Sequence, residues 1–360
     1  MTTLTPAIDC DIHPTLAGME PLLPYFEPIW ADHVRERGIE SLENSSYPPN
    51  TPLSVRHDWR DANGLPATDA VTLARDILDP TKTRTAILNC LAGVQLPHNV
   101  DFARAAARAV NDWVKHEWLD KDARLRSSIL ITPQNIDFAV EEIERCAPDK
   151  RFVQIMFLAM GEHPLGQRMY WPIYAAAEKH GLPIGIHAGS SFHHPVTSLG
   201  WNNFYIEDYV SQAFGFQAQV ASLITEGVFV KFPTLKVVLI ESGVSWAPSF
   251  LWRLTKFWRG MRSEVPWVDH APWEIFRDHI RMTITPLDAP DTAETVAKIT
   301  DHLHSDEILL YSSDYPHWQF DGQSSADNVL PAGLSESLRH KIMVDNPLAT
   351  YPRCREAFVQ

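Results

Sequence analysis

Five residues of the sequence have the side chains and the local setting that a divalent metal site requires. Asp11 and His13 stand two positions apart at the end of an apolar run, so in an extended strand both side chains point to the same side. His187, Glu241 and Asp314 each end or follow another short apolar run. Two imidazoles together with carboxylates suit Zn²⁺, Mn²⁺ or Fe²⁺ better than Ca²⁺ or an ion that prefers thiolates. These residues therefore predict the chemistry of a bound divalent metal.

Each of these residues also has an ordinary structural explanation when it is taken alone. His187 suits a hydrogen-bonded core histidine, and Glu241 could pair with Arg253. Asp314 could cap the turn that follows it, since aspartate favours that position. A shared site is favoured because the residues fall, in order, at the ends of separate predicted strands.

Eight short apolar runs, rich in Ile, Val, Leu or Phe, are typical of strands that are buried on both faces of a parallel sheet. The runs are Ala7–Ile12, Arg84–Cys90, Ser127–Thr132, Phe152–Leu158, Pro183–His187, Leu235–Ile240, Ile280–Ile284 and Glu307–Tyr311. Amphipathic stretches typical of helices lie between several of them, at Phe102–Trp118, Ile136–Cys146, Pro172–His180 and Thr292–Leu303. This alternation predicts an α/β fold with one domain over residues 1–360, a (β/α)₈ TIM-type barrel. No Gly-x-Gly-x-x-Gly motif follows the first run, which disfavours a dinucleotide-binding fold.

The ends of the first, fifth, sixth and eighth strands should meet at the C-terminal mouth of such a barrel, where these folds keep their active sites. Two long connections should also reach this mouth. One is a loop insertion at about residues 20–80, and the other follows the fifth strand and contains His193 and His194. We expect both connections to act as lids or as subunit contacts.

Composition limits the partners that the protein can have. The 360 residues include 31 Lys and Arg against 45 Asp and Glu, which gives a formal net charge of −14. The chain therefore lacks the basic surface of proteins that bind nucleic acids or anionic membranes. Four widely spaced cysteines, an N-terminus unlike a signal peptide and the absence of a long apolar run favour the reducing cytoplasm. We expect a small-molecule substrate.

The sequence contains the segments Ile8-Asp-Cys-Asp-Ile-His13, Pro183-Ile-Gly-Ile-His-Ala-Gly189, Phe232-Pro-Thr-Leu-Lys-Val-Val-Leu-Ile-Glu-Ser-Gly243, Leu310-Tyr-Ser-Ser-Asp-Tyr-Pro-His317 and Asn346-Pro-Leu-Ala349. Together, over almost the whole chain, these segments resemble the amidohydrolase superfamily. The branch they resemble is amidohydrolase-2, which includes aminocarboxymuconate-semialdehyde decarboxylase. The resemblance implies a distorted TIM barrel with a divalent metal held by Asp11, His13, His187 and Asp314. It also implies a homo-oligomer, or a heteromer with a similar barrel.

Two positions depart from the pattern of that branch. Many members have His where this chain has Asp11, although a carboxylate also occurs there, as Glu, in its hydroxybenzoate decarboxylases. The second departure is Glu241, which stands where decarboxylases and many hydrolases of the family have His. A glutamate can replace an imidazole in proton transfer only if burial raises its pKa. It can also ligate a second metal.

The first functional expectation is hydrolysis of a small, carboxylate-bearing organic substrate by a metal-activated water. The metal expected for this reaction is Zn²⁺, which lowers the pKa of its bound water towards ~7. Asp314 would serve as a ligand and a proton shuttle. His317, three residues further on, would orient the substrate or receive a proton, and Glu241 would take part as a catalytic group.

Two other reactions remain open. One is hydroxylation of a small carboxylic acid by a dinuclear Fe or Mn/Fe monooxygenase, which would be one subunit of a heteromer. Glu241 and His193 would supply the additional ligands for its second metal. The other is non-oxidative decarboxylation, for which the histidine expected in the place of Glu241 is missing.

Overall fold

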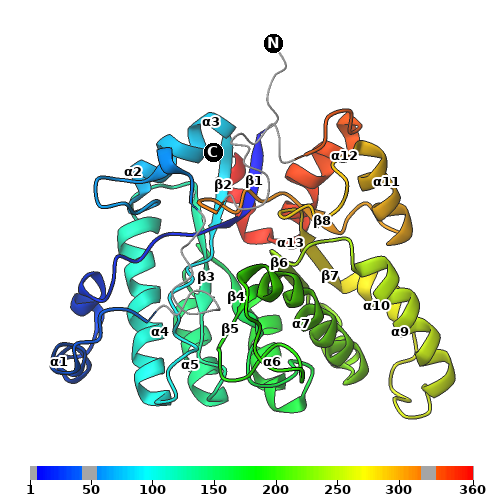
Figure 1. The fold of residues 1–360 in the computed structure, drawn as a ribbon, viewed down its shortest axis with the longest axis horizontal. Helices are drawn as coiled ribbons and strands as arrows, with labels where there is room; N and C mark the ends of the chain where they lie inside the picture. Colours follow the sequence, from blue (N-terminus) through cyan, green and yellow to red (C-terminus); the bar gives the residue numbers. More distant parts are fainter. Residues whose placement is uncertain (1–5, 43–54, 318–329, 360) are drawn as a thin grey trace.

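The apolar runs form eight parallel strands in the computed structural model of the chain, which describes residues 6–42, 55–317 and 330–359 (Figure 1). Each strand pairs with the next one along the chain, in the order β1 to β8. The strands are β1 (Ala7–Ile12), β2 (Thr83–Leu88), β3 (Leu125–Leu130), β4 (Phe152–Met160), β5 (Ile184–Ser190), β6 (Val237–Ile240), β7 (Ile280–Thr283) and β8 (Leu309–Leu310). The prediction of a single (β/α)₈ barrel is confirmed.

Backbone hydrogen bonds bring the last strand back to the first and nearly close the barrel. The amide of Cys10 donates to the carbonyl of Tyr311 at 3.0 Å, and the amide of His13 donates to the carbonyl of Tyr315 at 2.8 Å. A parallel bridge pairs Ile12 with Tyr315. The seam between β1 and β8 therefore runs through the segments that carry the expected metal ligands.

Helices cover the outside of the strands, and neighbours in sequence such as α4, α5 and α6 pack against one another (Figure 1). The helices are α1 (Pro28–Arg37), α2 (Ala70–Leu73), α3 (Asp79–Thr81), α4 (Val100–Val114), α5 (Ile136–Cys146), α6 (Trp171–His180), α7 (Tyr205–Thr225), α8 (Val228–Lys231), α9 (Ala247–Met261), α10 (Pro272–His279), α11 (Ala293–His302), α12 (Glu336–His340), α13 (Asn346–Thr350) and α14 (Arg355–Val359). Side chains of Asn99, Asn135 and Thr292 cap the starts of α4, α5 and α11 by accepting bonds from backbone amides.

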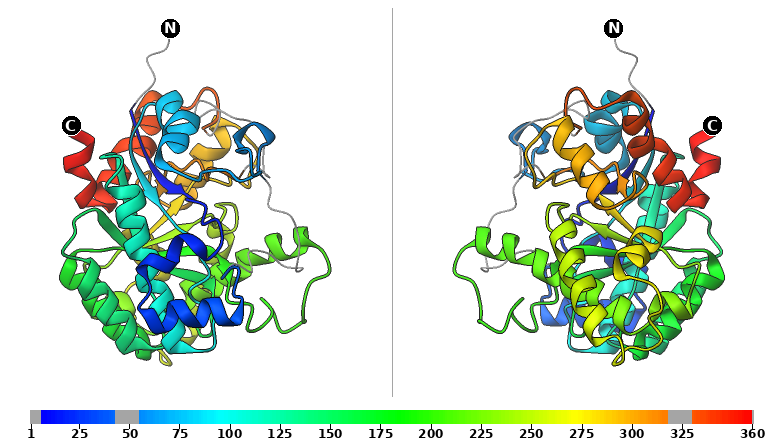
Figure 2. Two further views of the ribbon diagram at one scale, coloured as in Figure 1. Left: turned by 90° about the vertical axis from the view of Figure 1, so that its left-hand side faces the viewer. Right: turned by 90° about the vertical axis from the view of Figure 1, so that its right-hand side faces the viewer.

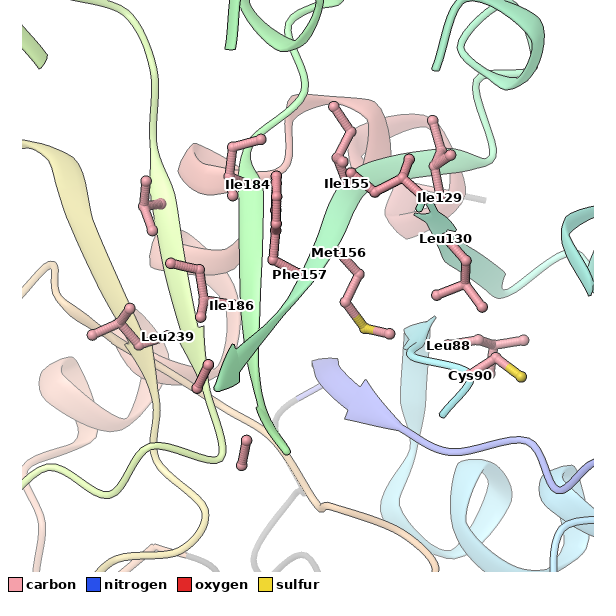
Figure 3. Close-up of a cluster of buried hydrophobic side chains, with 14 of the residues drawn as sticks. Leu88, Cys90, Ile129, Leu130, Ile155, Met156, Phe157, Ile184, Ile186 and Leu239 are labelled. Carbon is pink, nitrogen blue, oxygen red and sulfur yellow. The ribbon is translucent and has the colours of Figure 1, made fainter. Parts of the chain in front are cut away.

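The main core fills the space between the strands and the helices. Figure 3 shows part of it, including Ile129, Ile155 and Ile184 on three neighbouring strands. Ile155 is the register partner of both other residues, so the three side chains form one row across the sheet. Each of them is almost completely buried, which contributes about 1.5–3 kcal/mol per side chain relative to exposure. This packing gives the strand ends a rigid frame.

The two long connections differ from simple loops. The segment between β1 and β2, expected as an insertion at about 20–80, contains α1, α2 and α3, while its residues 43–54 lie outside the described part of the chain. The connection after β5 leads into α7, a helix of 21 residues that was not predicted from the sequence. In Figure 2 this connection and the start of α7 project from the body of the barrel.

Among the residues that the structure describes, no helix combines the length and the apolar character needed to cross a membrane.

Candidate metal centre

The structure brings together the five residues whose types and spacing predict a metal site. His13 Nε2 lies 2.9 Å from Asp314 Oδ1 and 3.4 Å from Asp11 Oδ1. His187 Nε2 lies 3.5 Å from Asp11 Oδ1 and 3.7 Å from Glu241 Oε2. All five residues are buried. Side chains from the ends of β1, β5, β6 and β8 thus form one continuous chain of contacts.

The backbone turns sharply where two of these residues leave their strands. Glu241 and Asp314 have φ angles of 58° and 56°, in the left-handed region that residues other than glycine rarely adopt. The amide of Glu241 donates to Thr283 Oγ1 at 2.9 Å, and the amide of Asp314 donates to the carbonyl of Asp11 at 3.1 Å. Such conformations cost of order 1–3 kcal/mol and concentrate at functional sites, where neighbouring structure holds them in place.

Both histidines of the cluster turn the same ring atom, Nε2, towards the carboxylates. His13 Nδ1 donates to the carbonyl of Asn89 at 2.8 Å, and His187 Nδ1 donates to the carbonyl of Ala188 at 2.6 Å. The same Asn89 donates from its side-chain Nδ2 to Asp11 Oδ1 at 2.8 Å. Hydrogen bonds of this kind fix the tautomer and orientation of metal-binding imidazoles.

The cluster leaves several buried polar atoms without a hydrogen bond. These atoms are Asp11 Oδ2, Asp314 Oδ2 and His187 Nε2. Leaving such groups unsatisfied is costly, whereas coordination to a cation would satisfy all three. Potential ligand atoms of Asp11, His13 and His187 lie within 4.8 Å of one another, and so do those of His13, Asp314 and His317. The donor set therefore fits a divalent ion such as Mn²⁺, Fe²⁺ or Zn²⁺.

The electrostatics of the cluster favour added positive charge. Burial raises the pKa of Glu241 well above its usual range, and the neighbouring Asp314 and Asp11 raise it further. Burial alone would raise the pKa of Asp314, but His317 and His13 hold it below its usual range. Burial raises the pKa of Asp9 to about 7. Several carboxyl groups thus share a space that is poor in water, and a metal ion would stabilise their charged forms.

Two of the remaining predicted residues lie in different places. His317 stacks on His13 with ring centroids 4.7 Å apart, and its Nδ1 lies 3.2 Å from Asp314 Oδ1. His193 instead contacts Glu162 Oε1 through Nδ1 at 2.7 Å and the carbonyl of Leu96 through Nε2 at 2.9 Å. His193 belongs to neither of the two groups of possible metal ligands found among the described residues.

Glu241 lies at the cluster and not beside Arg253, the ion-pair partner considered from the sequence. The Arg253 guanidinium lies over the ring of Phe257 instead, 5.1 Å from its centroid. The Glu241 carboxylate accepts a hydrogen bond from the hydroxyl of Tyr209 on α7. Neither Tyr209 nor Asn89 was predicted from the sequence, because neither belongs to a motif of acidic residues and histidines.

A cavity of about 220 Å³ opens beside the cluster. His13, Glu241 and His317 line it on the polar side, together with Tyr205 and Tyr209. Its apolar lining includes Leu16, Leu91, Val94, Leu96, Met156 and Leu158. A cavity of ~150 Å³ is enough to hold a benzene molecule, so the space suits one ring with small substituents. None of the described residues that line it is Lys or Arg.

Comparisons with known proteins show the family to which the chain belongs. The family model described as amidohydrolase matches residues 8–353. A gamma-resorcylate decarboxylase from Polaromonas sp. is 23% identical over 278 residues, which cover 74% of this chain and 82% of that protein.

Solved structures show the same fold at low sequence identity. An amidohydrolase from Mycobacterium avium subsp. paratuberculosis has a TM-score of 0.74 at 20% identity, covering 97% of this chain and 100% of that one. A dihydroxybenzoic acid decarboxylase from Polaromonas sp., with bound manganese and the inhibitor 2-nitroresorcinol, has a TM-score of 0.66 at 18% identity. The alignment covers 97% of each chain.

Proposed function

Because the chain belongs to the amidohydrolase family, we propose that it is a metal-dependent lyase that decarboxylates a small, mainly apolar carboxylic acid such as a hydroxylated benzoate. The observation that carries this proposal is the make-up of the cavity. A cluster of metal-type ligands adjoins apolar walls, and the described lining offers no Lys or Arg for a substrate carboxylate. A bound metal ion would serve as the cationic partner of the carboxylate. The similarity to a gamma-resorcylate decarboxylase supports the same substrate class.

Asp11, His13, His187 and Asp314 are the residues that would hold the ion. A bound divalent ion supplies positive charge that fixes a substrate carboxylate and polarises it. Asn89 keeps Asp11 and His13 in position through its side chain and its carbonyl. The apolar walls exclude water from the reacting face of the substrate, which strengthens electrostatic contacts there.

Decarboxylation breaks the bond between the carboxyl carbon and the substrate carbon, and the electron pair stays on the substrate carbon. That carbon then needs a proton. Glu241 lines the cavity, and burial raises the pKa of its carboxyl, so Oε2 can carry the proton to be delivered. The Tyr209 hydroxyl donates to Oε1 and orients the group. Solvent would return the proton after carbon dioxide leaves, and His317 would orient the substrate.

The test is incubation of the metal-free protein, reloaded with Mn²⁺, with 2,6-dihydroxybenzoate and 5-carboxyvanillate in D₂O. We expect release of carbon dioxide and one deuterium at the carbon that lost the carboxyl group. Oxygen uptake and the hydrolysis of ester and amide analogues are measured in parallel. Hydrolysis of the analogues without carbon dioxide release would contradict the proposal and restore the first expectation from the sequence.

One observation favours a second candidate function. Glu241 Oε2 lies 3.7 Å from His187 Nε2, so the carboxylate could ligate a second ion beside the first. Carboxylate-rich sites with two redox metals suit oxygen activation. Two iron or manganese ions per chain, with substrate-dependent oxygen uptake, would favour a monooxygenase over a decarboxylase.

A further inference from the structure

Helix α7 contributes a second group of polar side chains to the cavity of the metal centre. Tyr205, Asp208, Tyr209 and Gln212 all line this cavity, because residues three or four positions apart lie on one face of a helix. Tyr209 is tied to the metal centre by its hydrogen bond to Glu241. Asp208, by contrast, is in neither group of possible metal ligands in the described part of the chain. The helix therefore presents polar groups to the cavity beyond those that the metal centre uses.

The Asp208 carboxyl group is held in a costly environment. The residue is buried, with 6% of its surface exposed, and none of the described residues that line the cavity is Lys or Arg. Burial raises the pKa of the carboxyl above its usual range, and a hydrogen bond from the Gln212 side chain opposes part of that rise. A buried carboxylate without a cationic partner depends on its hydrogen bonds. Asp208 would therefore be stabilised by a ligand that donates one more.

Gln212 provides a second acceptor beside Asp208. Its amide group donates to the carboxylate through nitrogen, so its Oε1 oxygen is left for another partner. This oxygen is buried and has no hydrogen-bond partner among the residues that the structure describes. Leaving a buried acceptor unsatisfied is costly, and such an atom in a cavity wall is suited to a donor group on a ligand.

These acceptors lie close to the metal centre. Burial raises the pKa of Tyr205, and the charges of Glu241 and Asp208 raise it further, so both carboxyl groups act on the same hydroxyl. The cavity of about 220 Å³ suits a single ring. A ring whose carboxylate reaches the metal ligands therefore turns its other substituents towards the remaining walls, which include Asp208 and Gln212.

We propose that Asp208 and Gln212 accept hydrogen bonds from a hydroxyl group on the ring of the substrate and so select hydroxylated acids over unsubstituted ones. This inference rests on the proposed function, in which the metal centre holds the carboxylate of the same molecule. Apolar walls discriminate only weakly between a hydroxyl group and a hydrogen atom. Buried acceptors discriminate strongly, because a ligand without the hydroxyl leaves them unpaired.

Isothermal titration calorimetry of the full chain, loaded with Mn²⁺, tests the pair with benzoate and the three monohydroxybenzoates. We expect at least one hydroxybenzoate to bind about 10- to 100-fold more tightly than benzoate, as a hydrogen bond to an ionised acceptor implies. The corresponding methoxybenzoate should lack this gain, because its oxygen carries no hydrogen to donate. Carbon dioxide is measured in the same samples and reports separately on the proposed function.

Asp208→Leu and Gln212→Met each remove an acceptor and keep a side chain of similar length. In both variants the ratio of the dissociation constants for benzoate and the hydroxybenzoate should fall towards one. Glu207→Gln is the matched control, because this acidic residue of the same helical turn is exposed and is not among the described lining residues. It removes a charge from the start of α7 and should keep the ratio of the wild type.

The inference is wrong if no hydroxybenzoate binds more tightly than benzoate. It is also wrong if the gain persists in both variants, which would assign the hydroxyl group to the metal, or if the control loses the gain as well. Selective binding that depends on the pair, without carbon dioxide release, would contradict the decarboxylase and support the pair as a hydroxyl site.

Discussion

Asn89 is the residue through which the barrel interior controls the geometry of the proposed metal centre. Its Nδ2 donates to Asp11 Oδ1 at 2.8 Å, and its Oδ1 accepts from Gln154 Nε2 at 2.9 Å. Gln154 Oε1 in turn accepts from the hydroxyl of Tyr351 at 3.0 Å. The position of Asp11 thus depends on a buried network that reaches the C-terminal segment. We predict that Asn89→Ala weakens metal binding without unfolding the protein.

The size of the effect follows from the bond that is lost. A hydrogen bond to an ionised group contributes about 1.5–3 kcal/mol, and tenfold in affinity corresponds to about 1.4 kcal/mol. Asn89→Ala should therefore weaken Mn²⁺ binding by about 10- to 100-fold, as outer-shell substitutions typically do. The loss of affinity should not be larger, because the backbone carbonyl of residue 89 still accepts the hydrogen bond from His13.

The assay is titration of Mn²⁺ into metal-free protein in competition with a fluorescent chelator. Asn111→Ala is the matched control, because Asn111 is equally buried but donates to Leu130 O and Glu142 Oε1, outside the cluster. Both variants should unfold at lower denaturant concentration than the wild type. If Asn89→Ala binds Mn²⁺ as tightly as Asn111→Ala does, Asn89 has only a structural role and the reasoning fails.

Three further predictions concern the cluster and the core. His187→Ala and Asp314→Ala should each remove nearly all bound metal, as measured by elemental analysis, and circular dichroism should still show a folded barrel. Full metal content in either variant would show that the ligands are misassigned. Ile155→Ala should lower the free energy of unfolding by about 2–5 kcal/mol in urea titrations and leave metal affinity unchanged, because it opens a cavity in the core away from the cluster. Glu241→Gln should keep its metal and lose turnover if the carboxyl delivers a proton, whereas loss of one of two ions would indicate a dinuclear centre.

Local sequence patterns were sufficient to predict the barrel. All eight strands are short and almost entirely buried, so their apolar composition was visible in the sequence whatever the length of the connections. The stretch predicted as a helix at Ile136–Cys146 matches α5 residue for residue. The second half of helix α7 has a stripe that faces the core, made by Phe216, Val220 and Leu223. In its first half the apolar residues Ile206, Val210 and Phe214 are exposed, and Tyr205 and Tyr209 face the cavity. The helix was missed because its apolar residues therefore do not keep to one face along its whole length.

Only those site residues that lie at the ends of strands could be predicted from the sequence. Asp11, His187 and Glu241 were found because a polar residue at the end of an apolar run is conspicuous. Tyr209 reaches Glu241 from a helix, and Asn89 acts through an amide that has no characteristic spacing. Both roles depend on tertiary contacts that no local pattern encodes. Tyr209 and Glu241 are separated by 32 positions in the sequence, and Asn89 and Asp11 by 78 positions.

The seam that closes the barrel runs through the cluster of candidate metal ligands. Strand β8 has only two residues, and the seam between β8 and β1 depends on scattered bonds such as the amide of Ser313 donating to Asp9 Oδ1 at 3.0 Å. Asp11 and His13 lie on one side of this seam and Asp314 on the other. A divalent ion bound by all three would link the first strand to the last across about 300 residues of sequence. The ligand set would therefore add to the hydrogen bonds that already close the barrel, as well as serve the chemistry.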